Sequence, residues 1–279
     1  MPIAQREYEF TQKDFDRLRK ISIEHTGIVV TDDKFDMFYT RLARRIRALS
    51  IGSFSEYCDF LEANMDTELH ELVNSVTTNL TAFFREQHHF DYLKDEYIPQ
   101  LIKKNKTNHR IRIWSAGCST GEESYSIAMT LIQAIPNYKS WDIKILATDI
   151  DSNVLATAST GVYNEDRIDG LDSDLIQQFF QKGRGAHEGT VRISQEVRNF
   201  VSFKKLNLLK EWPMKQRFDI IFCRNVVIYF DAPTKTVLVE RYADILRDEG
   251  RLFMGHSESL MRITDKFDLI GHTVYEKAL

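Results

Sequence analysis

Residues 110–121, RIRIWSAGCSTG, contain an apolar run that ends in a glycine-rich turn. Residues 111–114 predict a β-strand, and apolar residues return at helical spacing from Ile127 onward. A strand, a glycine turn and a helix in this order are typical of a doubly wound parallel sheet. In such a sheet ligands lie at the carboxyl ends of the strands, where a glycine turn lets the backbone come close to them.

Strand and helix patterns alternate along the rest of the C-terminal region. Residues 143–147 predict a second strand, which ends near Asp149, and residues 218–222 form the near-continuous apolar run that is typical of a buried parallel strand. A helix that starts at Pro233 and a strand over residues 251–254 follow. The predicted fold class is therefore α/β, with a doubly wound, Rossmann-like sheet.

Residues 161–200 interrupt this alternation. They contain a turn-rich segment, 183–189, and after it residues 191–193 and 200–203 alternate like short antiparallel strands. We therefore expect a small antiparallel β insertion at about 161–200.

Residues 1–105 show helical patterns almost throughout. Thr11 and Asp14 predict a capping box at the start of the first helix, and apolar residues at helical spacing predict a second helix over 35–49. The sequence thus predicts two domains. An N-terminal helical domain with a linker helix covers 1–105, and a second domain over 106–279 carries the β insertion.

The composition limits the function classes. The chain has 279 residues and a formal net charge of −4, which argues against a protein that binds nucleic acid over its whole surface. Its three cysteines form no Cys-x-x-Cys pair, so neither a zinc site nor a redox motif is expected. The sequence shows no signal-peptide pattern and no apolar run of membrane-spanning length, so we expect a cytoplasmic protein without membrane insertion.

The turn after the first predicted strand is a candidate cofactor site. Gly117 and Gly121 would let a ligand approach the backbone, and Asp149 would accept hydrogen bonds from ribose hydroxyl groups. The spacing Gly-x-x-x-Gly does not match the dinucleotide pattern Gly-x-Gly-x-x-Gly, which disfavours a nicotinamide dehydrogenase. An ordinary α/β turn without a ligand is the alternative.

Three longer motifs carry a family resemblance. They are TTNLTAFFRE at 77–86, IWSAGCSTGEE at 113–123 and FCRNVVIYFD at 222–231. In the order, spacing and total length of these motifs the chain closely resembles the CheR-type chemotaxis receptor methyltransferases. The resemblance implies an all-α N-terminal domain, a domain that binds S-adenosylmethionine (SAM), and a β subdomain inserted into the latter.

The resemblance also implies a set of cofactor contacts around the glycine turn. With that turn included, the candidate cofactor-binding residues are Asn79, Thr81, Arg85, Gly117, Glu122, Asp149, Asn207, Leu208, Arg224 and Asn225. Within this set Glu122 is matched to the amino group of the methionine part and Asp149 to the ribose. Tyr229 is matched to a tyrosine near the transferred methyl group, and Tyr229 and Arg85 are the candidate catalytic residues. Lys103–Lys104 stand where the family has an arginine.

The expected chemistry depends on positioning rather than on proton transfer. A glutamate carboxylate with a pKa of about 4.3 is already ionised at neutral pH, so no general base is required. Holding the oxygen, the methyl carbon and the sulfur collinear is a proximity effect that can supply about 7 to 11 kcal/mol. Tyr229 could orient the acceptor as a neutral donor, or could be a core residue. The chain lacks the Asn-Pro-Pro-Tyr segment after residues 218–222 that would suggest an amino-group methyltransferase of DNA.

The helix predicted over 35–49 is a candidate receptor-docking surface. It carries four arginines: Arg41, Arg44 and Arg47 lie away from its apolar stripe, and Arg45 lies at the edge of that stripe. They predict a cationic face that would dock on an acidic partner. A solvated helix surface is the alternative.

The glycine-rich segment of the β insertion is a second candidate docking surface. Its residues are Gly183, Arg184, Gly185, Gly189 and Arg192. It resembles the β subdomain of family members that dock on a short peptide at the receptor's C-terminal tail. Such a peptide would add as a strand to an antiparallel edge, with Arg184 or Arg192 pairing with its acidic groups. A surface hairpin without a partner is the alternative.

Two further patterns are weaker. His88 and His89 are adjacent, and adjacent helical positions point to different sides, so no metal site is expected. Residues 255–259, GHSES, resemble a serine nucleophile elbow but end in Ser259 where glycine is required. We interpret them as a loop beside the cofactor pocket or as a structural element.

Together these patterns predict a cytoplasmic enzyme that transfers a methyl group from SAM to glutamate side chains of methyl-accepting chemotaxis receptors. The products are glutamate methyl esters and S-adenosylhomocysteine, and the reaction would serve receptor adaptation in bacterial chemotaxis. The expected partners are the cytoplasmic helical region of the receptors and their C-terminal tail, with no nucleic acid, and a monomer is expected. The alternatives are a SAM-dependent methyltransferase of another substrate and a catalytically idle receptor-binding adaptor.

Overall fold

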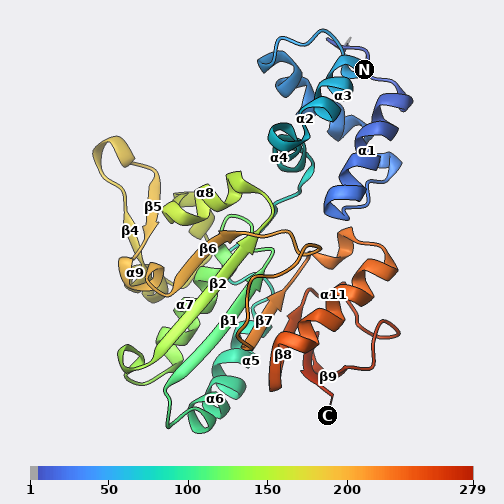
Figure 1. Ribbon diagram of the computed structural model, residues 1–279. Coiled ribbons are helices and arrows are strands. Elements are labelled where there is room, and N and C mark those ends of the chain that lie inside the picture. The colour runs from blue at the N-terminus through green and yellow to red at the C-terminus, as the bar shows by residue number, and fades with distance from the viewer. Residues whose placement is uncertain (1–5, 279) are drawn as a thin grey trace. The chain divides into compact units, whose positions relative to one another are not determined.

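Two compact units make up the chain. Figure 1 draws the computed structural model, which describes residues 6–278. The helical unit extends to Thr78 and also includes Tyr229–Thr234, and the sheet unit comprises Asn79–Ile228 and the residues from Lys235 onward. Among the described residues, no helix combines the length and the apolar character that crossing a membrane requires.

The helical unit consists of short amphipathic helices. They are α1 (Gln12–Thr26), α2 (Phe35–Ala48), α3 (Phe54–Ala63) and α4 (Met65–Val76), with a 3₁₀ turn at Asp32–Lys34. The predicted capping box is present, because Thr11 Oγ1 accepts from the backbone N–H of Asp14 at 3.2 Å while Asp14 Oδ2 accepts from that of Thr11 at 3.0 Å. Gly27 ends α1 with a φ of 72°, a left-handed conformation in which glycine is favoured.

An aromatic core holds these helices together. The rings of Phe10 and Phe54 lie 4.2 Å apart, and Phe15 contacts Phe38 edge to face at 5.3 Å. Leu42 is also fully buried in this cluster. The buried faces are those that the helical spacing of apolar residues predicts.

The sheet unit is built on one main sheet. Its strands, in spatial order, are β6 (Val201–Lys205), β2 (Asp142–Asp149), β1 (Arg110–Ala116), β7 (Phe218–Cys223), β8 (Leu246–Met254), β10 (Val274–Lys277) and β9 (Phe267–Gly271). The strands from β6 to β8 run parallel, and β10 is antiparallel to both β8 and β9. This order confirms the predicted doubly wound α/β fold.

One predicted strand pairing is wrong. The sequence analysis placed residues 200–203 among the antiparallel strands of the insertion, but β6 pairs in parallel with β2, with Phe203 opposite Ala147. Alternation along a strand shows which side chains share a face, and it does not show which strand lies beside them.

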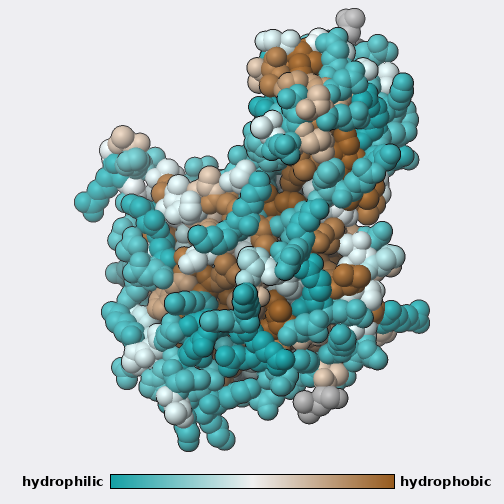
Figure 2. Space-filling view, in the orientation of Figure 1, coloured by the Kyte–Doolittle hydropathy of each residue, from teal (hydrophilic) through white to brown (hydrophobic). Residues whose placement is uncertain are grey.

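The insertion itself forms a separate small antiparallel sheet. Its strands, in spatial order, are β3 (Val162–Asn164), β5 (Thr190–Ile193) and β4 (Phe180–Lys182). The hairpin between β4 and β5 projects from the sheet unit in Figure 1, and its surface is mainly hydrophilic in Figure 2. Gly183 is required there because a Cβ atom would overlap the carbonyl oxygen of His187.

Further helices accompany the two sheets, and the helix Ser173–Phe179 lies next to β4 of the small sheet. These helices are α5 (His88–Tyr92), a π-helical turn (Leu93–Tyr97), α6 (Ile98–Lys104), α7 (Glu122–Ala134), α8 (Ser152–Thr160), α9 (Ser173–Phe179), α10 (Gln195–Arg198) and α11 (Ala232–Ile245), with 3₁₀ turns at Tyr138–Ser140, Glu165–Ile168, Gly185–His187 and Val227–Tyr229. The predicted N-terminal part, 1–105, includes a linker helix, and the chain divides into its two compact units after Thr78. The physical reason is that Phe90, Leu93 and Leu101 are buried in the same core as β1 and α7.

Candidate active site

The glycine turn after β1 lies at the carboxyl ends of β1 and β2. The backbone N–H groups of Gly117 and Cys118 both donate to the carbonyl oxygen of Thr148, at 2.8 and 2.9 Å. Gly117 has a φ of 83°, and the place of a Cβ there is taken by Cγ2 of Val226. The glycine therefore lets another strand-end turn pack against this one, a role in protein packing that the sequence analysis did not consider.

Asp149 is the acidic residue at the carboxyl end of β2. Only 9% of the residue is exposed, and its carboxylate accepts from the N–H groups of Ser119 at 2.8 Å and Asp151 at 3.0 Å. Burial raises its pKa from 3.8 to about 6, although these N–H groups act in the opposite direction. A nearly buried carboxylate at the end of the second strand fits a ligand that brings hydroxyl donors, such as a ribose.

The polar segment that starts at Asn79 runs beside the glycine turn. Asn79 donates from Nδ2 to Asp151 Oδ2 at 2.8 Å, and its carbonyl oxygen accepts from Ser119 Oγ at 3.0 Å. Arg85 donates from Nη1 to the carbonyl oxygen of Leu80 at 2.8 Å and so closes the segment on itself. The structure thus brings Asn79 and Asp149 to one place, as the motifs predict.

Glu122 is the first residue of α7 and is completely buried. Its carboxylate accepts from Thr120 Oγ1 at 2.6 Å and forms an ion pair with Arg167. Arg167 also donates to the carbonyl oxygen of Thr81 at 2.7 Å. Arg167 therefore connects two predicted cofactor residues, and nothing in the local sequence pattern marks it.

The loop after β6 carries Asn207 and Leu208. It is tied to the same edge because the N–H of Leu206 donates to the carbonyl oxygen of Asp149 at 2.9 Å. Arg241 of α11 donates to the carbonyl oxygen of Leu208 at 2.7 Å, and its guanidinium lies 3.9 Å from the centre of the Trp212 ring. A cation–π contact of this kind holds the loop in one conformation.

Arg224 forms a buried ion network at the end of β7. Its side chain is 2% exposed and lies 3.4 Å from both Glu86 and Glu123, and it also donates to the carbonyl oxygen of Arg85. Burial raises the pKa of Glu123, while Arg224 opposes that rise. The network joins the polar segment, α7 and β7, and Glu123 is a member that the sequence analysis missed.

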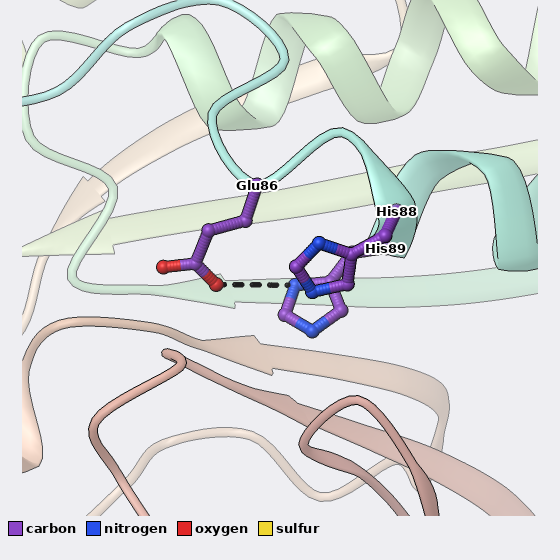
Figure 3. A group of neighbouring side chains, drawn as sticks. All are labelled: Glu86, His88 and His89. Atoms are coloured by element: carbon purple, nitrogen blue, oxygen red, sulfur yellow. Dashed lines mark ion pairs between the residues drawn. The ribbon is translucent and has the colours of Figure 1, made fainter.

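Glu86, His88 and His89 form a cluster beside this network (Figure 3). The expectation that the two histidines point to different sides is wrong, because their ring centres are 4.3 Å apart. His89 Nε2 contacts the carbonyl oxygen of His272 at 2.6 Å, and burial lowers the pKa of His89 to about 4, so the ring is neutral at neutral pH.

The Glu86 carboxylate already has positively polarised neighbours. His256 Nδ1 lies 3.0 Å from Oε1, and Nη2 of Arg224 lies 3.4 Å from Oε2. Burial raises the pKa of Glu86, but the hydrogen bond from His256 and the charge of Arg224 hold it below its ordinary value. The charge of Arg224 and the hydrogen bond from His256 therefore account for the ionised state of this carboxylate.

The remaining catalytic candidate, Tyr229, belongs to the helical unit. It is half-buried, and its carbonyl oxygen accepts from the N–H of Val29 at 2.8 Å. In sequence it follows directly the turn after β7 that carries Arg224 and Asn225. Its role near the transferred methyl group stays a prediction.

The arginines of α2 are largely occupied within the helical unit. Arg41 donates to the carbonyl oxygen of Thr77 at 2.6 Å, and Arg45 donates to both carboxylate oxygens of the buried Glu68 at 2.9 and 2.6 Å. Arg47 pairs with Glu7. Arg44 is exposed. Arg47 is exposed as well, but it shares its charge with Glu7.

The glycine-rich segment forms the projecting β4–β5 hairpin, with Gly183, Gly185 and Gly189 in or next to its turn. Arg184 and Arg192 are both exposed. β4 is an edge strand, so its outer side has backbone groups that an added strand could pair with. Peptide docking there stays a prediction.

Two known families of domains match this chain. The domain described as "CheR methyltransferase, SAM binding domain" matches residues 79–276, and "CheR methyltransferase, all-alpha domain" matches residues 13–77. The chain belongs to the CheR methyltransferase family. This membership confirms the resemblance drawn from the motifs, and with it a helical domain and a SAM-binding methyltransferase domain.

Curated relatives of the CheR family cover nearly the whole chain. "Chemotaxis protein methyltransferase 2" of Pseudomonas aeruginosa is 43% identical over 274 residues, which are 98% of this chain and 95% of the relative. "Chemotaxis protein methyltransferase" of Escherichia coli is 43% identical over 264 residues, which are 94% of this chain and 89% of the relative. The similarity therefore includes both units and the β insertion.

Proposed function

We propose that this CheR family member transfers a methyl group from SAM to glutamate side chains of methyl-accepting chemotaxis receptors. The observation that carries this proposal is the near-full-length similarity to chemotaxis protein methyltransferases, at 43% identity. The products would be a glutamate methyl ester and S-adenosylhomocysteine. The reaction would adjust receptor signalling in the cytoplasm.

The geometry of the strand ends supports binding of SAM. Asp149 would accept hydrogen bonds from the ribose hydroxyls, and Glu122 would pair with the amino group of the methionine part. The loop of Asn207 and Leu208, held by Arg241, would lie along the adenine. These residues come from the ends of β2, β1 and β6, which are neighbours in the sheet.

When bound, SAM supplies a methyl group on a positively charged sulfur, which a carboxylate oxygen displaces in line. The new bond joins the glutamate oxygen to the methyl carbon, and the electron pair of the broken bond stays on sulfur. Because the acceptor is already ionised, the residues of this chain need to position it and need not remove a proton. Tyr229 would orient the acceptor as a neutral donor, and Arg85 would fix the segment that closes over the cofactor.

The receptor would dock through two surfaces of this chain. Arg44 gives α2 an exposed positive charge toward acidic receptor helices. The edge strand β4 would accept a peptide from the receptor tail as an added strand, next to Arg184 and Arg192.

The experiment is a transfer assay with the purified protein. Membranes that bear chemotaxis receptors are incubated with SAM carrying a radiolabelled methyl group, and the proteins are then separated by size. We expect label on a receptor-sized band that base releases, because esters hydrolyse in base whereas methylated amines do not. Base-stable label on another protein would instead support a methyltransferase of another substrate. Binding to receptors without any label would support an idle adaptor.

A further inference from the structure

The turn after β7 lies where the chain passes from the predicted cofactor contacts to Tyr229. It follows Arg224 and extends to Ile228, and it contains no proline that would restrict its backbone. Asn225 has a φ of 58°, which is uncommon for a residue other than glycine. A left-handed backbone conformation at a residue other than glycine persists only where surrounding contacts stabilise it.

A single carboxylate holds this turn. Glu258, which is 3% exposed, lies in the loop after β8. Its Oε2 accepts from the N–H of Asn225 at 2.7 Å, and its Oε1 accepts from those of Val226 at 2.8 Å and Ile228 at 3.1 Å. Oε2 accepts a further N–H from Gly255 of its own loop at 2.8 Å. Hydrogen bonds from backbone N–H groups to an ionised carboxylate are among the strong ones.

The neighbouring glycines show how closely the turn is enclosed. On the β8 side, a Cβ on Gly255 would lie 2.6 Å from Asn225 Nδ2 and 2.9 Å from Asn225 N. On the β1 side, a Cβ on Gly117 would overlap Val226. The turn is thus packed between the ends of β1 and β8, which flank β7 in Figure 1. A small change in its backbone has no empty space to move into.

We propose that Glu258 is a positioning residue for methyl transfer, which fixes the turn from Asn225 to Ile228 on the acceptor side of the site. This inference rests on the proposed function. The turn leads in sequence directly to Tyr229, the residue matched to the transferred methyl group, and the Asn225 amide lies against Gly255 at the end of β8, whereas Asp149 is on β2, two strands from β7. Glu258 acts through the backbone, since its carboxylate accepts from four main-chain N–H groups.

The variant Glu258→Gln tests the proposal. Either orientation of the new amide directs its NH₂ group at two backbone N–H donors, so the hydrogen bonds of one carboxylate oxygen are lost. We expect kcat to fall by about tenfold or more with receptor membranes as the acceptor. The dissociation constant of S-adenosylhomocysteine, measured by calorimetry, should change by less than about threefold, because no cofactor candidate is replaced: Asp149 and Glu122 are unaltered, and Asn225 keeps its side chain.

The matched control is Asp219→Asn at the opposite end of β7. Asp219 is also a buried carboxylate, 2% exposed, and accepts from the N–H of Arg112 at 2.8 Å. Loss of the Asp219 carboxylate should lower the melting temperature. It should leave kcat unchanged, because Asp219 lies near the start of β7 and the turn from Asn225 to Ile228 follows the end of that strand. A fall of kcat in Glu258→Gln alone, at a similar melting temperature, supports the positioning role.

Two results would overturn the inference. One is a Glu258→Gln enzyme with kcat within about twofold of the parent, and the other is a parallel loss of kcat and of S-adenosylhomocysteine affinity. If Glu258→Gln does not fold, Gly255→Ala is judged by the same criteria, since its Cβ presses on the backbone of Asn225. Absence of transfer by the parent protein would refute the proposed function instead.

Discussion

Replacing Asp149 by asparagine should stabilise the protein at neutral pH while it weakens cofactor binding. Burial raises the pKa of this carboxyl from 3.8 to about 6, and a difference of one in pKa corresponds to about 1.4 kcal/mol. Keeping Asp149 ionised therefore costs the folded state about 3 kcal/mol. Asparagine has no charge and so removes the cost of ionisation. It accepts through one oxygen only, so the N–H group of either Ser119 or Asp151 loses its acceptor, which destabilises the folded state by about 1 to 2 kcal/mol. The net gain in the free energy of unfolding is about 1 to 2 kcal/mol.

The raised pKa of Asp149 also determines how the stability difference between the variant and the parent changes with pH. Because the folded-state pKa lies above the unfolded one, the folded protein binds a proton between about pH 6 and about pH 4 that the unfolded chain does not bind. The parent protein is therefore relieved of the cost as the pH falls through this range. The advantage of Asp149→Asn should be largest above about pH 6 and disappear near pH 4.

Urea unfolding of both proteins at about pH 7.5 and about pH 4.5 measures the difference, and other carboxyl groups cancel in the comparison. Calorimetry should show S-adenosylhomocysteine binding weakened by about 100-fold in the variant. In the parent protein this binding should weaken as the pH falls below about 6, because ribose donors favour the ionised carboxylate.

The control for the stability measurement is Asp142→Asn, at the exposed start of the same strand. The hydrogen bond from Arg112 lowers the pKa of Asp142, so this variant should show no gain in the free energy of unfolding. A less stable Asp149→Asn protein at neutral pH would refute the reasoning.

Further predictions concern the helical unit and the ion network. Arg44→Glu should raise the KM for receptor membranes and leave S-adenosylhomocysteine binding unchanged; normal methylation by this variant would contradict docking through α2. Glu68→Gln should cost about 3 kcal/mol in urea unfolding, because it leaves Arg45 without its ion pair and alters the acceptor of the Tyr57 hydroxyl. Dialysis against a chelator should not change the transfer rate, since a guanidinium already pairs with Glu86. Activity lost on dialysis and restored by zinc would show that this cluster holds a metal.

Local sequence patterns were enough to predict several elements of this protein. The Thr11–Asp14 capping box and the buried strand β7 both follow from interactions between residues close in sequence or from the period of apolar residues. The position of Asp149 also follows, because the carboxyl ends of neighbouring parallel strands meet at one edge of the sheet.

Contacts between residues far apart in sequence could not be predicted in this way. Three examples are the pairing of β6 with β2, the ion pair of Arg167 with Glu122, and the hydrogen bonds from three N–H groups of the turn after β7 to Glu258, and each joins segments that have no shared periodicity. The motif around Glu258 was visible in the sequence, but its partners were not.

The periodicity of the sequence predicts an α/β protein with a helical domain, and its motifs carry the resemblance to a SAM-binding family. Which charged groups already have partners inside the protein follows from the folded chain alone, because those partners lie far away in sequence. Arg45, Arg224 and Glu258 are charged, but each is already bonded inside the protein. The periodicity of apolar residues shows which face of a helix or strand a side chain lies on. It does not show which residue packs against that face, because that residue comes from a distant part of the chain.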